Sequence, residues 1–180
     1  MIVRRAKTAV QGYNAQAVAT AEQIIVAADV SQQTNDAGQL EPMLRAAARE
    51  LQDAGVGEPI AVALADGGYW SSPQIAALRE DGIQTIVPTK AAARTAPRTL
   101  SARQGPEAER IDRLLDTPHG AALYRRRQQI IEPVFAHTKF LRRIDRFQRR
   151  GPAACKAEWQ LIAAGHNLLK LWRATTPAAA

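Results

Sequence analysis

The fold class of this chain is set by residues 59–90, PIAVALADGGYWSSPQIAALREDGIQTIVPTK. The apolar run at 59–65 and the segment QTIVPTK at 84–90 are typical of strands that are buried on both faces. Between them, the sequence Ser-Ser-Pro begins and Gly82 ends a helix that we predict over 71–81. A strand, a helix and a second strand in this order predict a parallel pair with a crossover helix, and therefore an α/β fold.

Upstream of this unit, the sequence predicts a β-hairpin followed by a helix. Residues 12–20 and 23–30 have the composition of strands, and the short gap between them is typical of a hairpin. Apolar residues then recur at helical spacing from Leu40 to Leu51, up to a stop at Gly55. The first two strands are therefore expected to be antiparallel neighbours.

Downstream, the chain becomes irregular before it becomes helical. Residues 91–120 are rich in Ala, Arg, Pro and Thr, and only 107–115 has helical spacing, so we expect a loop or insertion here. Two helices are predicted next, over 121–149 and 153–173, with a Gly-Pro pair between them. The Ala/Pro tail at 174–180 need not fold.

Length and composition limit the class of protein and of partner. A chain of 180 residues suits one domain, here 1–173, and its net charge of +7 favours nucleic acid or another polyanion. The basic excess is concentrated from Arg94 onward. One cysteine excludes an internal disulfide, and three histidines with one cysteine do not suit a zinc site. No signal peptide or membrane-spanning run is evident, so we expect a cytoplasmic protein without a membrane partner.

One carboxylate, Glu132, lies within the strongly basic segment 124–150. A surface that only bound a polyanion would gain nothing from it, because an acid repels phosphate and weakens counterion release. A divalent cation held against that phosphate would explain the acid, whereas the alternative is a surface ion pair of little energetic value. Pro133 disfavours helical geometry at Glu132, so we expect the helix to kink or restart there.

A second carboxylate, Asp66, ends the first strand of the β-α-β unit. Ligands of open parallel sheets bind at the carboxyl ends of strands, and the following Gly67-Gly68 allows the backbone to approach a ligand. The position suits metal binding. The alternative is that Asp66 caps a local backbone N–H, which is the commoner role of an Asp before Gly-Gly.

Four motifs together resemble the C-terminal part of the DDE-type transposases of bacterial insertion sequences. They are LADGGYW from Leu64, EPVFAHTK from Glu132, GYNAQ from Gly12 and AEWQLIAAGHNLLKLW from Ala157, and they cover nearly the whole chain. The resemblance implies an RNase H-like mixed sheet flanked by helices, with a C-terminal helical pair. It also implies metal-dependent cleavage and transfer of DNA strands with Mg²⁺ or Mn²⁺, and the transposon ends as the DNA partner.

The resemblance also implies the site residues. The family's three acids are an Asp on the first strand, an Asp in an A-D-x-G-Y context and a Glu on a late helix. Asp66 and Glu132 match the second and third, which implies catalytic and metal-binding roles for both. Related elements carry a Tyr-Arg-Glu-Lys signature around the family's Glu, and Tyr124, Arg127, Glu132 and Lys139 resemble it. The interval from Arg127 to Glu132 is one residue longer here than in that signature. The DNA-binding candidates are Tyr124, Arg127, Lys139, Arg142 and Arg143.

The family's first acid has no counterpart, because residues 1–11, which precede the predicted hairpin, contain no Asp or Glu. We therefore expect that the first strand is absent and that this chain is inactive without a missing N-terminal portion. Asp29 and Asp36 are not expected to reach the metal site. The open sheet edge predicts homo-oligomerisation. The alternative function is a non-catalytic DNA-binding or interaction protein derived from a transposase.

Overall fold

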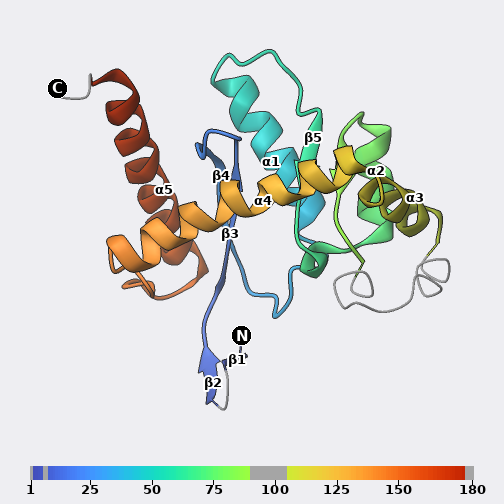
Figure 1. Ribbon diagram of the computed structural model, residues 1–180. Helices are drawn as coiled ribbons and strands as arrows, with labels where there is room; N and C mark the ends of the chain where they lie inside the picture. Colours follow the sequence, from blue (N-terminus) through green and yellow to red (C-terminus); the bar gives the residue numbers. More distant parts are fainter. Residues whose placement is uncertain (1, 6–7, 90–104, 177–180) are drawn as a thin grey trace. The chain divides into compact units, whose positions relative to one another are not determined.

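The computed structural model describes residues 2–5, 8–89 and 105–176 of a mixed α/β protein (Figure 1). In chain order, its elements are β1 (Ile2–Arg5), β2 (Thr8–Gln11), β3 (Asn14–Ala19), β4 (Ile25–Ser31), α1 (Leu40–Asp53), β5 (Val62–Leu64), α2 (Ser72–Glu80), β6 (Gln84–Ile86), α3 (Pro106–Leu115), α4 (Pro118–Ala136) and α5 (Pro152–Thr175). The chain forms two compact units. We call Met1–Thr34 with Gln128–Ala180 the terminal unit, and Asn35–Arg127 the central unit.

The terminal unit contains two antiparallel hairpins. Strands β3 and β4 pair from Asn14 opposite Ser31 to Ala19 opposite Ile25, which confirms the predicted hairpin. Strands β1 and β2 form a second hairpin that the sequence did not predict. The described strands of this unit are therefore joined only to their neighbours in sequence.

Helix α5 packs against β4 and closes one side of the terminal unit (Figure 1). The indole Nε1 of the buried Trp159 donates to the backbone carbonyl of Gln16 at 2.7 Å. The Asn167 side chain accepts from the Ile25 N–H at 2.8 Å and donates to the Ile25 carbonyl at 2.7 Å. Asn167 thus satisfies both backbone groups of Ile25, as a neighbouring strand would, so α5 replaces a third strand here.

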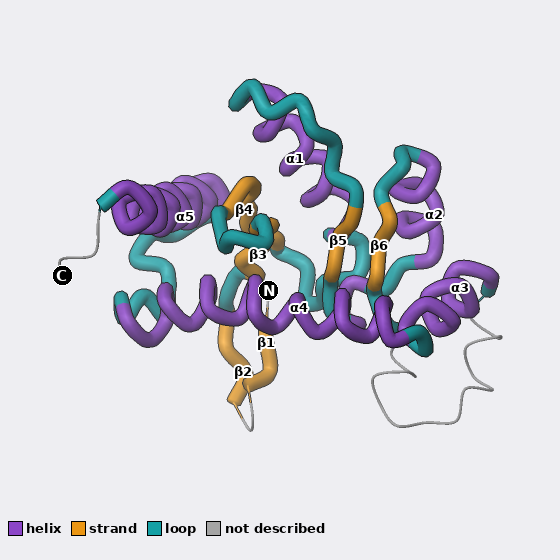
Figure 2. Tube along the Cα trace, turned by 45° about the horizontal axis from the view of Figure 1, so that its top comes forward, coloured by secondary structure: helices purple, strands orange, loops and turns teal. Residues whose placement is uncertain are grey.

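The central unit contains the predicted β-α-β arrangement. Strands β5 and β6 are parallel, α2 connects them, and Val62, Ala63 and Leu64 face Gln84, Thr85 and Ile86 in order (Figure 2). Strand β5 is shorter than the predicted 59–65, and Val62 is 41% exposed, so the expectation of burial on both faces is wrong at its start. The ladder with β6 accordingly runs only from Val62 opposite Gln84 to Leu64 opposite Ile86.

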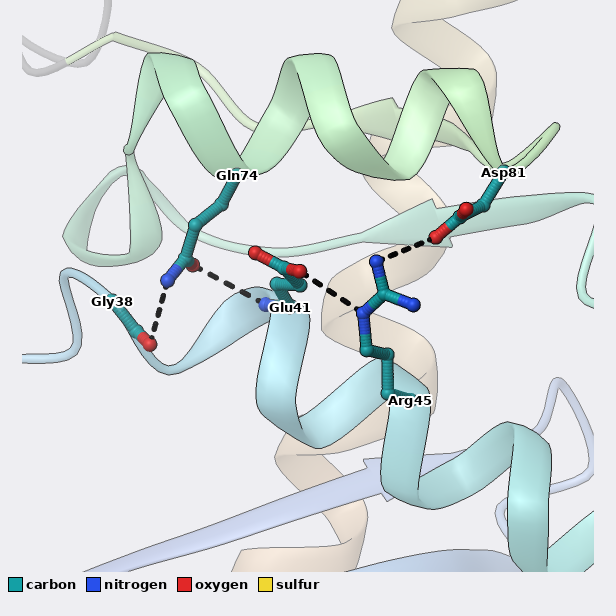
Figure 3. A network of polar contacts seen from close by, with 5 residues as sticks. All are labelled: Gly38, Glu41, Arg45, Gln74 and Asp81. Atoms are coloured by element: carbon teal, nitrogen blue, oxygen red, sulfur yellow. Dashed lines mark hydrogen bonds and ion pairs between the residues drawn. The ribbon is translucent and has the colours of Figure 1, made fainter.

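Helix α1 confirms the helix predicted from Leu40. Backbone groups at its start form hydrogen bonds with a side chain of α2 (Figure 3). The Gln74 side chain accepts from the Glu41 N–H at 3.2 Å and donates to the Gly38 carbonyl at 2.8 Å. One turn later, the Arg45 guanidinium contacts Glu41 and Asp81, each at 2.9 Å. A long-range partner therefore takes the place of a local N-cap side chain.

The described strands form three two-stranded sheets instead of the single mixed sheet that we expected. Helix α4 ends at Ala136, and a π-helical turn over His137–Leu141 follows it, so the helix predicted to reach residue 149 is too long. Arg143 has a left-handed backbone with φ of 57°, which a continuing helix does not allow. Helix α5 confirms the last predicted helix.

Helix α3 confirms the helical spacing over 107–115 within the expected loop at 91–120, and α4 begins at Pro118 inside the same stretch. Residues 90–104 of that loop, and 177–180 of the predicted tail, lie outside the described residues. Among the helices that are described, none is both long enough and apolar enough for a membrane crossing.

Candidate functional site

Asp66 follows β5 at the carboxyl end of the parallel pair, as predicted. Its Oδ1 accepts a hydrogen bond from the Gly68 N–H at 2.8 Å and caps the 3-10 turn Gly67–Tyr69. The capping role that is common for Asp before Gly-Gly is therefore realised. Such a cap engages one oxygen of the carboxylate and is compatible with cation binding by the other.

Asp36 reaches the turn that carries Asp66. A Cβ placed on Gly68 would lie 2.8 Å from Asp66 Oδ1 and 3.3 Å from Asp36 Oδ2, so two carboxylates converge on the position that this glycine leaves open. That Asp36 takes no part in metal binding stays a prediction. Asp29 is held elsewhere, in the terminal unit, by Lys156 Nζ at 2.8 Å.

Tyr124 and Arg127 belong to the part of α4 that lies in the central unit, together with Asp66. Arg127 Cζ lies 5.7 Å from the centroid of the Tyr124 ring, a cation–π arrangement. Burial raises the pKa of Tyr124, Arg127 acts in the opposite direction, and the Asp66 carboxylate raises it further. Three of the predicted site residues therefore lie close enough to act on one another, and the phenol remains protonated at neutral pH.

Glu132 lies exposed on the part of α4 that belongs to the terminal unit. The helix continues through Glu132 and Pro133 to Ala136, so of the two outcomes expected at Pro133, a kink or a restart, the restart does not occur. Glu132 therefore projects from the interior of a helix and not from its N-terminus.

The predicted cationic residues follow on the π-helical turn and just beyond it. Lys139 Nζ lies 5.3 Å from the centroid of the Phe135 ring. The Arg142 guanidinium donates through Nη2 to the Gly165 carbonyl at 2.9 Å, which ties the turn to α5. Arg143 is exposed and has the left-handed backbone. Arg142 therefore holds the π-helical turn against α5, in addition to its predicted role in DNA binding.

Two histidines meet between α4 and α5. The rings of His137 and His166 lie edge to face with centroids 5.6 Å apart, and His166 Nε2 is 2.9 Å from the Gln23 carbonyl. His166 is buried, and its ring nitrogen has a hydrogen-bond partner, as is usual for a core histidine. Cys155 is also buried, and burial raises the pKa of its thiol, which makes the thiol less reactive.

The oxygen donors of Asp66 and Glu132 suit a hard divalent cation such as Mg²⁺ or Mn²⁺. Asp66 belongs to the central unit and Glu132 to the terminal unit. Within the described parts of the chain, no group of three or more His, Cys, Asp or Glu side chains is placed to hold a metal ion.

No sequence pattern pointed to Gln23, whose side chain contacts the segment that carries Glu132. Pro133 is the only signal that could have pointed to such a partner, because it leaves a helical carbonyl in need of a donor. Which residue supplies the donor depends on tertiary packing.

Comparison with known proteins gives one match. Residues 4–168 match the family model described as transposase DDE domain. No curated protein and no solved structure matches the chain. The matched range includes every residue predicted for the site.

Proposed function

The chain belongs to the family of transposase DDE domains, and we propose that it is the catalytic part of a DNA transposase in which Asp66 and Glu132 bind the metal. The observation that carries this proposal is the family match over residues 4–168. It is supported by Asp66 at the carboxyl end of β5 and by Glu132 in the interior of α4. We further propose that the fold is RNase H-like.

In this proposal, the two carboxylates would hold Mg²⁺ or Mn²⁺, and the metal would supply Lewis-acid stabilisation of the charged oxygens in a phosphoryl transfer. Tyr124 donates a hydrogen bond from its phenolic O–H to a DNA phosphate, since its raised pKa keeps it protonated. Arg127 and Lys139 neutralise phosphates and so fix the register of the DNA on the protein. The other cations proposed to bind DNA are Arg142 and Arg143.

We also propose that these 180 residues do not join DNA strands by themselves. The family uses three acids, and residues 1–11 supply no Asp or Glu for the first one. Asp36 lies near Asp66, whereas Asp29 is paired with Lys156 in the other unit. In this proposal, activity requires an added polypeptide segment that contributes the first acid.

Binding of Mn²⁺ to the full chain tests the metal site without requiring activity. We expect Asp66→Asn and Glu132→Gln each to weaken Mn²⁺ affinity by about tenfold or more, as loss of a ligand does, measured by the electron paramagnetic resonance of free Mn²⁺. The matched control is Asp53→Asn, which removes one charge at the exposed end of α1. Equal losses in all three variants would show non-specific attraction and contradict the proposed site.

A further inference from the structure

Pro133 lies inside α4, next to Glu132, and yet the helix continues beyond it. A proline has no N–H, so the carbonyl of Gln129, four residues earlier, loses its helical donor. The proline ring also crowds this carbonyl, which usually kinks or breaks the helix. The Gln129 carbonyl therefore needs another donor if the helix is to remain intact at Glu132.

Gln23 supplies that donor from the turn between β3 and β4. Its Nε2 donates to the Gln129 carbonyl at 2.9 Å. Its Oε1 accepts from Lys170 Nζ at 2.9 Å, and its backbone carbonyl lies 2.9 Å from Nε2 of the buried His166. One residue thus contacts both α4 and α5, and all of these groups belong to the terminal unit.

The backbone of Gln23 is itself unusual. Its φ of 65° lies in the left-handed region, which a glutamine rarely adopts. Its N–H donates to the Thr20 carbonyl at 2.9 Å and closes the turn. Strain of this kind persists only where the surrounding contacts fix the residue, and it is a reason to look for a role.

We infer that Gln23 is a positioning residue for Glu132. The hydrogen bond to the Gln129 carbonyl keeps α4 continuous across Pro133, and a continuous helix fixes the direction in which the Glu132 carboxylate projects. The consequence for metal binding rests on the role proposed above for Glu132. The competing explanation is that water satisfies the Gln129 carbonyl, because this hydrogen bond is exposed.

The variant Gln23→Glu tests the inference in the full chain. It preserves the shape of the side chain and an acceptor for Lys170, but it removes the N–H donor. The matched control is Gln160→Glu, the same change at an exposed position of α5. Pro133→Ala restores the missing helical N–H, so it should rescue Gln23→Glu if the carbonyl is the cause.

Two measurements separate positioning from general stability. Hydrogen exchange of the peptide 128–137 should accelerate about fivefold in Gln23→Glu, the factor expected for loss of one ordinary hydrogen bond. Mn²⁺ affinity should fall severalfold in the same variant. Both effects should be absent in Gln160→Glu, and both should disappear when Gln23→Glu is combined with Pro133→Ala and compared with Pro133→Ala by itself.

Unchanged hydrogen exchange in Gln23→Glu would overturn the inference in favour of water. Faster exchange with unchanged Mn²⁺ affinity, in a chain where Glu132→Gln weakens that affinity, would overturn the positioning role and leave Gln23 as a helix-stabilising residue. If Glu132→Gln itself leaves Mn²⁺ affinity unchanged, the metal role of Glu132 fails. Hydrogen exchange with its Pro133→Ala rescue then decides whether Gln23 fixes the backbone at Glu132.

Discussion

At the scale of single residues, the surroundings of a titratable side chain shift its pKa and so decide whether it is neutral or charged. Burial lowers the pKa of His137 below its ordinary value of 6.5, because the protonated ring is poorly solvated between α4 and α5. Nearby positive or protonatable groups act in the same direction. They are Arg142, His166, Arg173 and Lys170.

This environment predicts a loss of stability in mild acid. The unfolded chain takes up a proton at His137 near pH 6.5, whereas the folded chain does so only at lower pH. The contribution of His137 to the free energy of unfolding is therefore fully present above pH 6.5 and decreases as the pH drops below that value. We expect urea unfolding midpoints to decrease between pH 7.5 and 5.0, and to decrease less in His137→Leu. The control His119→Asn, at an exposed position, should retain the full pH dependence. An identical pH dependence in His137→Leu would exclude this histidine as the cause.

At the scale of elements, helix α3 shows how burial decides the value of an ion pair. Glu107 is 6% exposed and contacts Arg79 Nε of α2 at 3.1 Å and Arg110 Nε at 3.0 Å. Glu109, on the same helix, pairs with Arg113 at 2.6 Å on the exposed face. The first carboxylate joins two helices, whereas the second makes a pair within one helix turn.

The two carboxylates provide a matched pair of substitutions. Glu107→Ala should lower the free energy of unfolding by about 1.5–3 kcal/mol, because it removes the buried carboxylate that pairs with the partly exposed Arg79 and Arg110. Glu109→Ala should cost less than about 0.5 kcal/mol, as exposed helix pairs do. Chemical denaturation of both variants measures the difference. Equal costs would show that the contact of Glu107 with α2 contributes nothing beyond a surface pair.

At the scale of the whole molecule, charge and family membership point to the same partner. The chain has a net charge of +7, and the family to which it belongs acts on DNA. The cations at 139–143 lie on and just after the π-helical turn that follows Glu132. The sequence left two functions open, a catalytic transposase domain and a non-catalytic DNA-binding protein. Glu132 distinguishes them, because its carboxylate would repel DNA phosphates unless it holds a metal ion.

Salt-dependent DNA binding therefore gives opposite results for the two functions. Lys139→Ala should weaken binding and reduce the slope of log K against log salt by about one unit. Glu132→Gln should weaken Mn²⁺-dependent binding if the acid holds a metal, and should strengthen binding in chelator if it only repels phosphate. Fluorescence anisotropy with duplex DNA measures both. Stronger binding of Glu132→Gln in Mn²⁺ and in chelator alike would favour the non-catalytic protein.

Local rules were sufficient for much of the fold. The hairpin over 12–30, the β-α-β unit within 59–90 and helix α5 depend on periodicity, turns and caps that lie within a few residues of one another. The same rules included capping as one of the two roles considered for Asp66, and this cap joins residues only two positions apart. They predicted too long a helix, because the chain beyond Ala136 forms a π-helical turn and then a left-handed backbone at Arg143.

The sequence by itself determined the fold class, the basic character and the two candidate acids, because composition and motifs are properties of the chain. Only the tertiary structure decided that Asp36 lies beside Gly68 and that Gln23 contacts Gln129. The latter two residues are 106 positions apart, and neither has a local pattern that requires the other. Their contact exists because β3, β4, α5 and the part of α4 from Gln128 onward belong to one unit, which brings a side-chain donor to the carbonyl that Pro133 leaves without its helical partner.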